Sequence, residues 1–295
     1  MTRHRVALIT STEAWQIDED APLLVHALAE QGIDAEPVIW DTSKVDWARY
    51  RAVILRSPWD YTERPEEFLD VMQQIQLHSP VLNPLEVLRW NIDKHYLADL
   101  AQAGLAVVPT TFIDDLDSLK EDSFPAEGGF VVKPTISSGS RNSAHYSQTQ
   151  RSEAAAHATR LLHSQQQVMV QPYLGSVDHV GETGMVFFLG EFSHGFRKAA
   201  LLGQGSAAIE GLYAPEEIET REPSAAELEL ARRALEITSE QCGTGPLLYA
   251  RVDVLQGDDG EPQLLELELT EPSYFLRTDP SSAQRAAAAY ARALS

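Results

Sequence analysis

Cysteine is almost absent from the 295-residue chain, since Cys242 is the single one. One cysteine cannot form an intramolecular disulfide, so the fold must depend on its apolar core. Long apolar runs are also missing, and no stretch approaches the roughly 20 residues of a membrane span. The basic first residues are followed only by Val6–Ile9, which is too short for a signal peptide. We therefore expect a cytoplasmic protein that does not bind membranes.

Basic charge is scarce as well, with 23 Lys and Arg against 44 Asp and Glu and a formal net charge of −21. Nucleic-acid binding draws much of its affinity from cations that neutralise phosphates. A chain this acidic, without a basic run, is therefore not expected to bind nucleic acid. A small polyanion is compatible with this charge, because it needs only a few local cations. The oligomeric state stays open, with a homo-oligomer as one alternative.

The order of the expected elements divides the chain into three segments. Strands alternate with amphipathic helices in residues 1–90, which predicts a small, mostly parallel lobe. Residues 91–172 contain a helix at 93–103, a later helix and three strands. Residues 173–295 are expected to form antiparallel strands with two helices. The predicted fold class is therefore α/β with α+β lobes.

The sharpest chemical signal is a hairpin near the C-terminus, where two strands flank a Gly-Asp-Asp-Gly turn. Side chains alternate faces along a strand, so Arg251 and Asp253 share one face of the first strand. Glu266 and Glu268 share one face of the second strand, while Leu265 takes the opposite face. Pairing the strands gathers three carboxylates and a guanidinium. Mg²⁺ prefers such oxygen ligands, although the solvated face of an ordinary hairpin is the alternative.

Cations appear at two further places. Lys133 ends a strand and precedes a small flexible loop that contains Ser138, Gly139 and Ser140, which suits a polyphosphate. Lys94 falls in the first turn of its expected helix, where the helix dipole disfavours a cation unless an anion lies nearby. A solvated surface position is the alternative for both lysines.

Together these pieces resemble the ATP-grasp superfamily in their order, over about residues 91–274. The matching motifs are Asp93-Lys94, Val131-Val132-Lys133-Pro134, Val170-Gln171-Pro172-Tyr173-Leu174, Glu182, Arg197-Lys198, Ala250-Arg251-Val252-Asp253 and Leu265-Glu266-Leu267-Glu268. The resemblance implies a substrate lobe at 1–90, a small ATP-grasp lobe at 91–172 and a metal-binding lobe at 173–295. The bound groups would be ATP and one or two Mg²⁺ ions.

The resemblance also implies roles for individual residues. Nucleotide contacts would come from Lys94, Lys133, Ser138, Gly139 and Ser140 for the phosphates, from Gln171, Pro172, Tyr173 and Leu174 for the adenine, and from Glu182 or Asp178 for the ribose. Asp253, Glu266 and Glu268 would hold the metal, although the superfamily often has Asn where this chain has Glu268. Arg251 would act in catalysis with Arg197 or Lys198, two neighbours that point to opposite faces of one strand.

A narrower resemblance involves Leu55–Tyr61, Asn83–Lys94 and Ser193–Lys198. These segments are similar to a bacterial ATP-grasp group that includes the O-ureido-D-serine cyclo-ligase of D-cycloserine biosynthesis. The candidate substrate residues that follow are Arg56, Ser57, Trp59, Asp60, Tyr61 and Arg277. Packing aromatics, a turn-capping aspartate and an exposed arginine are the structural alternatives.

The favoured function is an ATP-dependent ligase that activates a small carboxylate for attack by an amine nitrogen. The nitrogen could belong to the same molecule or to a second substrate. A small-molecule kinase and a non-catalytic nucleotide-binding module are the competing classes. Residues 199–213 carry three glycines and no periodicity, so we expect them to form a lid over the site. His194, next to this segment, is a candidate acid or base.

Overall fold

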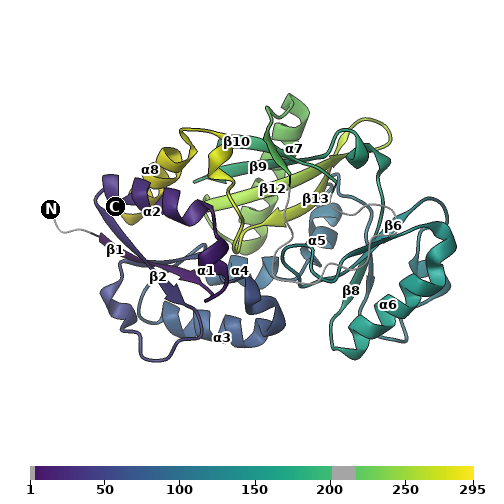
Figure 1. Cartoon of the computed structure of the whole chain (residues 1–295), viewed down its shortest axis with the longest axis horizontal. Helices are drawn as coiled ribbons and strands as arrows, with labels where there is room; N and C mark the ends of the chain where they lie inside the picture. The colour runs from purple at the N-terminus through teal and green to yellow at the C-terminus, as the bar shows by residue number, and fades with distance from the viewer. Residues whose placement is uncertain (1–3, 201–216) are drawn as a thin grey trace.

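The computed structural model describes residues 4–200 and 217–295, arranged as three sheets with helices packed on them (Figure 1). Each sheet falls within one of the three segments expected from the sequence. Most of the expected lid lies outside the described residues. No helix in the described part of the chain has the length and apolarity needed to cross a bilayer.

The N-terminal sheet is parallel, with strand order β2-β1-β3-β4. Its elements are β1 (His4–Thr10), α1 (Ala14–Ile17), α2 (Asp20–Glu30), β2 (Ile33–Ile39), β3 (Ala52–Ser57), α3 (Pro65–Gln76) and β4 (Val81–Leu82). Val6–Ile9 is fully buried at the centre of this sheet. The mostly parallel sheet expected here is formed, because its central strands β1 and β3 contain apolar runs that are covered on both faces.

The central sheet has strand order β5-β8-β6-β7 and is antiparallel. Its elements are β5 (Thr111–Ile113), β6 (Phe130–Pro134), β7 (Ala144–Tyr146), α6 (Arg151–His163) and β8 (Val168–Pro172). The alanines of α6 pack with Phe130 and Val132 to form a small core of their own. Lys133 lies on the opposite face of β6 from Val132, because side chains alternate along the strand. The central lobe therefore presents Lys133 away from its own core.

The C-terminal sheet has strand order β11-β10-β9-β12-β13. Its elements are β9 (Glu182–Phe188), β10 (Glu191–Lys198), β11 (Ile218–Thr220), α7 (Ala225–Cys242), β12 (Tyr249–Gln256), β13 (Pro262–Glu268) and α8 (Ser282–Leu294). Met185 and Phe187 pack with α7, whereas Val186 and Phe188 pack with α8 and the N-terminal lobe. The sheet is therefore covered on both faces. The polar residues Lys198, Glu266 and Glu268 remain accessible from a cleft.

The segment around Lys94 differs from the expectation of one helix at 93–103. The structure has two short helices, α4 (Leu85–Asn91) and α5 (Tyr96–Gln102), and Lys94 lies in the turn between them. Asn91 explains the break, since its side chain accepts from Leu269 N at 2.8 Å and donates to Leu267 O at 2.7 Å. This anchor ties the turn to β13. As a result α5 packs with α7 of the C-terminal lobe, although the sequence placed residues 91–102 with the central lobe.

Candidate active site

A cleft of about 200 Å³ separates the central sheet from the C-terminal sheet. The central lobe contributes Lys133 and the Ser137–Ser140 loop to its walls. The C-terminal lobe contributes Lys198, Glu266 and Glu268. Residues from distant parts of the sequence therefore converge on one polar cavity.

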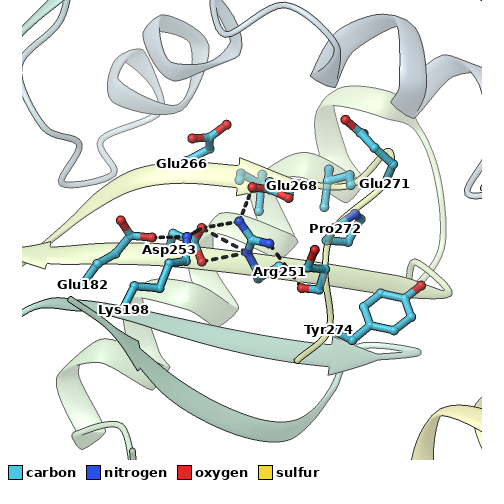
Figure 2. Close-up of polar contacts among 12 residues, drawn as sticks. Glu182, Lys198, Arg251, Asp253, Glu266, Glu268, Glu271, Pro272 and Tyr274 are labelled. Atoms are coloured by element: carbon cyan, nitrogen blue, oxygen red, sulfur yellow. Dashed lines mark hydrogen bonds and ion pairs between the residues drawn. The ribbon is translucent and has the colours of Figure 1, made fainter. Parts of the chain in front are cut away.

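The carboxylate hairpin has the expected pairing, with Arg251 opposite Glu268 and Asp253 opposite Glu266. Asp253 is enclosed by cations. It accepts hydrogen bonds from Lys198 Nζ at 2.8 Å and from Arg251 Nη2 at 2.8 Å. Glu268 pairs with the same Nη2 atom of Arg251. Figure 2 shows this row, with Lys198 and Arg251 on either side of Asp253.

Burial and charge move the carboxyl pKa values apart. Burial raises the pKa of Asp253, but Arg251 and Lys198 outweigh it and hold the pKa at about 2. Burial raises the pKa of Glu268 to about 8, because the nearby carboxylates Glu266 and Asp253 add to the effect against Arg251. The raised pKa shows that the charged form of Glu268 is not fully compensated by Arg251, so a cation bound beside Glu268 would favour that form.

A β-bulge alters the hairpin face at Leu265. Asp253 pairs with Glu266, yet the next residue along β12, Val254, pairs with Leu264. Leu265 is the extra residue, and it lines the cleft beside Glu266. The expectation that Leu265 takes the opposite face is therefore wrong, because a bulge breaks the alternation and re-aims a side chain.

Three lysines line the cleft, and their environments differ. Lys94 Nζ lies 3.1 Å from Glu266 and donates to Ser137 O at 2.9 Å. Lys198 pairs with Glu182 as well as with Asp253. Lys133 makes no ion pair with any described residue, and burial lowers its pKa, with Lys94 and Lys198 acting in the same direction. An anion beside Lys133 would offset this cost.

The far end of the cleft is formed by the strand end and loop at Gln171–Leu174, all four of which line it. Tyr173 is held by a hydrogen bond from its N–H to Gly129 O at 2.8 Å and by stacking on His145, with ring centroids 3.8 Å apart. Leu265 and Leu174 add apolar surface. This end can take a flat aromatic ring with polar edges.

The adjacent cations Arg197 and Lys198 point to opposite faces of β10, because side chains alternate along a strand. Lys198 lines the cleft, whereas Arg197 donates to Val180 O at 2.8 Å and faces Glu219. Arg197 therefore lies outside the site. Asp178 also lies outside it and accepts from the Tyr173 hydroxyl, while Glu182 lines the cleft.

The six candidate substrate residues also divide into those that line the cleft and those that do not. Trp59 and Tyr61 line the cleft. The other four do not: Arg56 is fully buried, Ser57 is buried with its hydroxyl 2.9 Å from the Thr10 hydroxyl, Asp60 accepts from Trp40 Nε1 at 2.8 Å, and Arg277 is 68% exposed beside Glu19. These four correct the sequence expectation, because their polar atoms are engaged or directed elsewhere.

Glu271 lines the cleft but was not among the sequence candidates. It lies three residues after the end of β13, so it falls outside the alternating pattern by which Glu266 and Glu268 were chosen. A carboxylate next to proline, in the segment Thr270-Glu271-Pro272, carries no periodic signal. Its position depends on contacts with the N-terminal lobe that the sequence does not reveal.

The cleft lies between two lobes and is lined by lysines. The end of β8 forms one side of it, and the carboxylate hairpin β12–β13 forms another. This combination defines an ATP-grasp ligase. The solved structure of D-alanine–D-alanine ligase from Bacillus anthracis complexed with ATP shares this fold, with a TM-score of 0.67 and 16% identity over 99% of this chain and 94% of that one. The fold expected from the sequence is therefore confirmed.

Closer relatives define the family. The model of the N-terminal domain of D-cycloserine synthetase DcsG matches residues 6–83. The cycloserine biosynthesis protein DcsG of Streptomyces lavendulae is 37% identical over 98% of both chains. The crystal structure of D-cycloserine synthetase DcsG gives a TM-score of 0.92 at 36% identity, covering 99% of this chain and 100% of that one. The chain belongs to the DcsG family and is an ATP-dependent ligase that forms a C–N bond.

Proposed function

We propose that this ligase closes a ring within one small amino-acid derivative, with O-ureido-D-serine as substrate and D-cycloserine as product. The observation that carries the proposal is the similarity to DcsG over the full length of both chains. An intramolecular nucleophile avoids the entropy cost of a second binding event, worth up to ~7–11 kcal/mol of barrier when well oriented.

One orientation of ATP is proposed for the cleft. The adenine would lie at Gln171–Leu174, the ribose hydroxyls would reach Glu182, and the phosphates would run past Lys133 and Lys94 with the Ser138–Ser140 backbone. Lys133 supports this order most strongly, since its buried charge lacks an ion pair among the described residues. Charge-assisted hydrogen bonds to phosphate oxygens are about twice as strong as neutral ones.

Glu266 and Glu268 are the residues that would hold Mg²⁺. Each exposes about a quarter of its side chain, 24% and 26% respectively, in the cleft. No group of three or more Asp, Glu, His or Cys side chains within residues 4–200 and 217–295 is arranged to hold an ion. Two carboxylates still fit, because Mg²⁺ is commonly held by one or two carboxylates together with substrate phosphates. Bound Mg²⁺ supplies charge neutralisation between the carboxylates and the phosphates.

The reaction has two bond changes at the activated carboxyl. A carboxylate oxygen attacks the γ-phosphorus, and the bond to the β-phosphate oxygen breaks to release ADP. The oxygen-linked nitrogen then attacks the acyl carbon, loses its proton and displaces phosphate. The ring product carries no carbamoyl group, so water removes that group as CO₂ and ammonia. Arg251, fixed by Asp253 and Ser273 O, stabilises the charge on the acyl phosphate.

Enzyme incubated with Mg-ATP and O-ureido-D-serine should form D-cycloserine and ADP in equal amounts, measured by mass spectrometry. A two-substrate ligase would instead give ADP only when a separate amine is added. A kinase would accumulate a phosphorylated acid with no amine. Absence of the ring product, with ADP formed from another acid and amine, overturns the cyclisation proposal and leaves the C–N ligase.

Lys133→Ala should weaken ATP binding by about 10- to 100-fold, because a charge-assisted contact with phosphate is lost. Isothermal titration calorimetry with a non-hydrolysable ATP analogue measures this. Lys120→Ala provides the matched control, since Lys120 is an exposed lysine of the same lobe. A folded Lys133→Ala protein with the parent's ATP affinity would exclude the phosphate role.

A further inference from the structure

Glu271 stands apart from the other carboxylates of the cleft. Asp253, Glu266, Glu268 and Glu182 each pair with a lysine or arginine. Glu271 is 9% exposed and makes no ion pair with any described residue. Residues 201–216, outside the described part, contain no Lys, Arg or His and so have no cationic side chain to offer.

Glu271 instead contacts two aromatic residues, one through its carboxylate and one through its main-chain carbonyl. The Tyr61 hydroxyl donates a hydrogen bond to the carboxylate, and the Trp59 indole N–H donates to the Glu271 carbonyl at 3.2 Å. Burial raises the pKa of Glu271 to about 7, with the Tyr61 hydrogen bond and Lys94 acting in the opposite direction. Both rings line the cleft beside it. A carboxylate next to aromatic faces suits an organic cation.

The segment that carries Glu271 is held rigidly. Pro272 O accepts from Arg56 Nη1 at 2.5 Å, and Ser273 O accepts from Arg251 at 3.2 Å. The next N–H group, that of Tyr274, donates to Asp20 at 2.7 Å. Figure 2 shows Glu271 at the opposite end of the row from Glu182 and Lys198. The position is thus built by three elements, which is what a recognition site requires.

We propose that Glu271, with the Tyr61 hydroxyl and the Trp59 ring, forms a subsite for the α-ammonium group of the substrate. This inference rests on the proposed function in so far as the substrate is an amino-acid derivative. Holding the ammonium at Glu271 directs the substrate carboxylate along the cleft toward Arg251, where it is activated. Glu271 is therefore a specificity-determining residue that selects amino acids over simple carboxylic acids.

The test compares pairs of ligands that differ only in the ammonium group. O-ureido-D-serine is paired with 3-(ureidooxy)propanoate, and D-serine and L-serine are each paired with 3-hydroxypropanoate. Calorimetry with a non-hydrolysable ATP analogue and Mg²⁺ measures affinity without turnover. The parent should bind the ammonium-bearing member of at least one pair about 10- to 100-fold more tightly.

Glu271→Gln should bring that ratio close to one by weakening only the ammonium-bearing ligand. Glu271→Asp, which keeps the charge, should restore part of the preference, a response that a purely structural role would not give. Affinity for the ATP analogue and the melting temperature should stay at the parent's values. Glu229→Gln, an exposed carboxylate of α7, is the matched control.

Two results would overturn the subsite. They are equal affinities within every pair for the parent, or a ratio in Glu271→Gln that stays at the parent's value, including the case in which both members of a pair bind equally more weakly. Failure of the ring-forming reaction is a separate result, since the calorimetric ratio does not depend on which bond is formed. A parent that prefers serine but forms no D-cycloserine would retain the subsite and lose the cyclisation.

Discussion

Arg56→Met should lower the free energy of unfolding by about 3–5 kcal/mol, because it leaves buried carboxylates without their counter-charge. Arg56 is fully buried and donates to Asp18 at 2.8 and 3.1 Å and to Asp20 at 3.2 Å. Burial disfavours its charge, but the two aspartates reverse this and raise the Arg56 pKa, so the guanidinium stays charged. Methionine fills similar volume without a charge.

Calorimetric melting measures the effect, and a fall of about 6–20 °C corresponds to this free energy. Arg277→Met is the matched control: an exposed arginine beside Glu19 at 3.7 Å should cost less than about 0.5 kcal/mol. Arg56→Lys should recover only part of the loss, because an ammonium cannot make the same forked contacts. A normal melting temperature with a raised KM for the substrate would restore Arg56 as a substrate contact.

These two arginines show what the sequence could not resolve. Arg56 lies near the end of β3 and Arg277 follows β13, and nothing in their sequence neighbours distinguishes a buried ion cluster from an exposed loop. The outcome for Arg56 depends on Asp18 and Asp20, which lie more than 30 residues earlier in the chain. Long-range partners of this kind have no local pattern.

Periodic features were predicted well because they depend on local geometry. The hairpin strands and the shared face of Arg251, Asp253, Glu266 and Glu268 follow from alternation and turn residues. The failures occur where a tertiary contact overrides the local pattern. The helix expected at 93–103 begins only at Tyr96, after a turn that Asn91 ties to β13, and the bulge at Leu265 turns that side chain into the cleft. Glu271 was missed because its setting comes from Trp59 and Tyr61 in another lobe.

Glu266→Gln should lower kcat by at least about 100-fold, comparable to removing one preorganised electrostatic contact from an active site. Glutamine keeps the size and can still accept from Lys94, now 3.1 Å from the carboxylate, so packing is preserved. The lost charge weakens Mg²⁺ binding and leaves the phosphates less neutralised. The ADP-forming rate, measured over a range of Mg²⁺ concentrations, should therefore require more metal than the parent does.

Metal binding itself is measured by Mn²⁺ electron paramagnetic resonance in the presence of ADP. Glu266→Gln and Glu268→Gln should each bind Mn²⁺ at least about 10-fold more weakly, since even outer-shell partners of a metal are worth about 10- to 100-fold. Glu236→Gln removes an exposed carboxylate, paired with Arg233 at 3.1 Å, and should bind Mn²⁺ as the parent does. Parent-like Mn²⁺ affinity and rate in both site variants would remove these residues from the metal site.

Asp253→Asn should behave differently from the two glutamate variants. Both of its oxygens already accept from Arg251 and one accepts from Lys198, so its charge chiefly balances those buried cations. Its loss removes the most deeply buried carboxylate that Arg251 and Lys198 share and leaves them only Glu268 and Glu182, which lowers the melting temperature more than Glu266→Gln does. If Asp253→Asn instead keeps the parent's melting temperature and loses Mn²⁺ affinity, then Lys198 and Arg251 must leave Asp253 when the metal binds. The pair of measurements thus separates a carboxylate that holds metal from one that holds the cations in place.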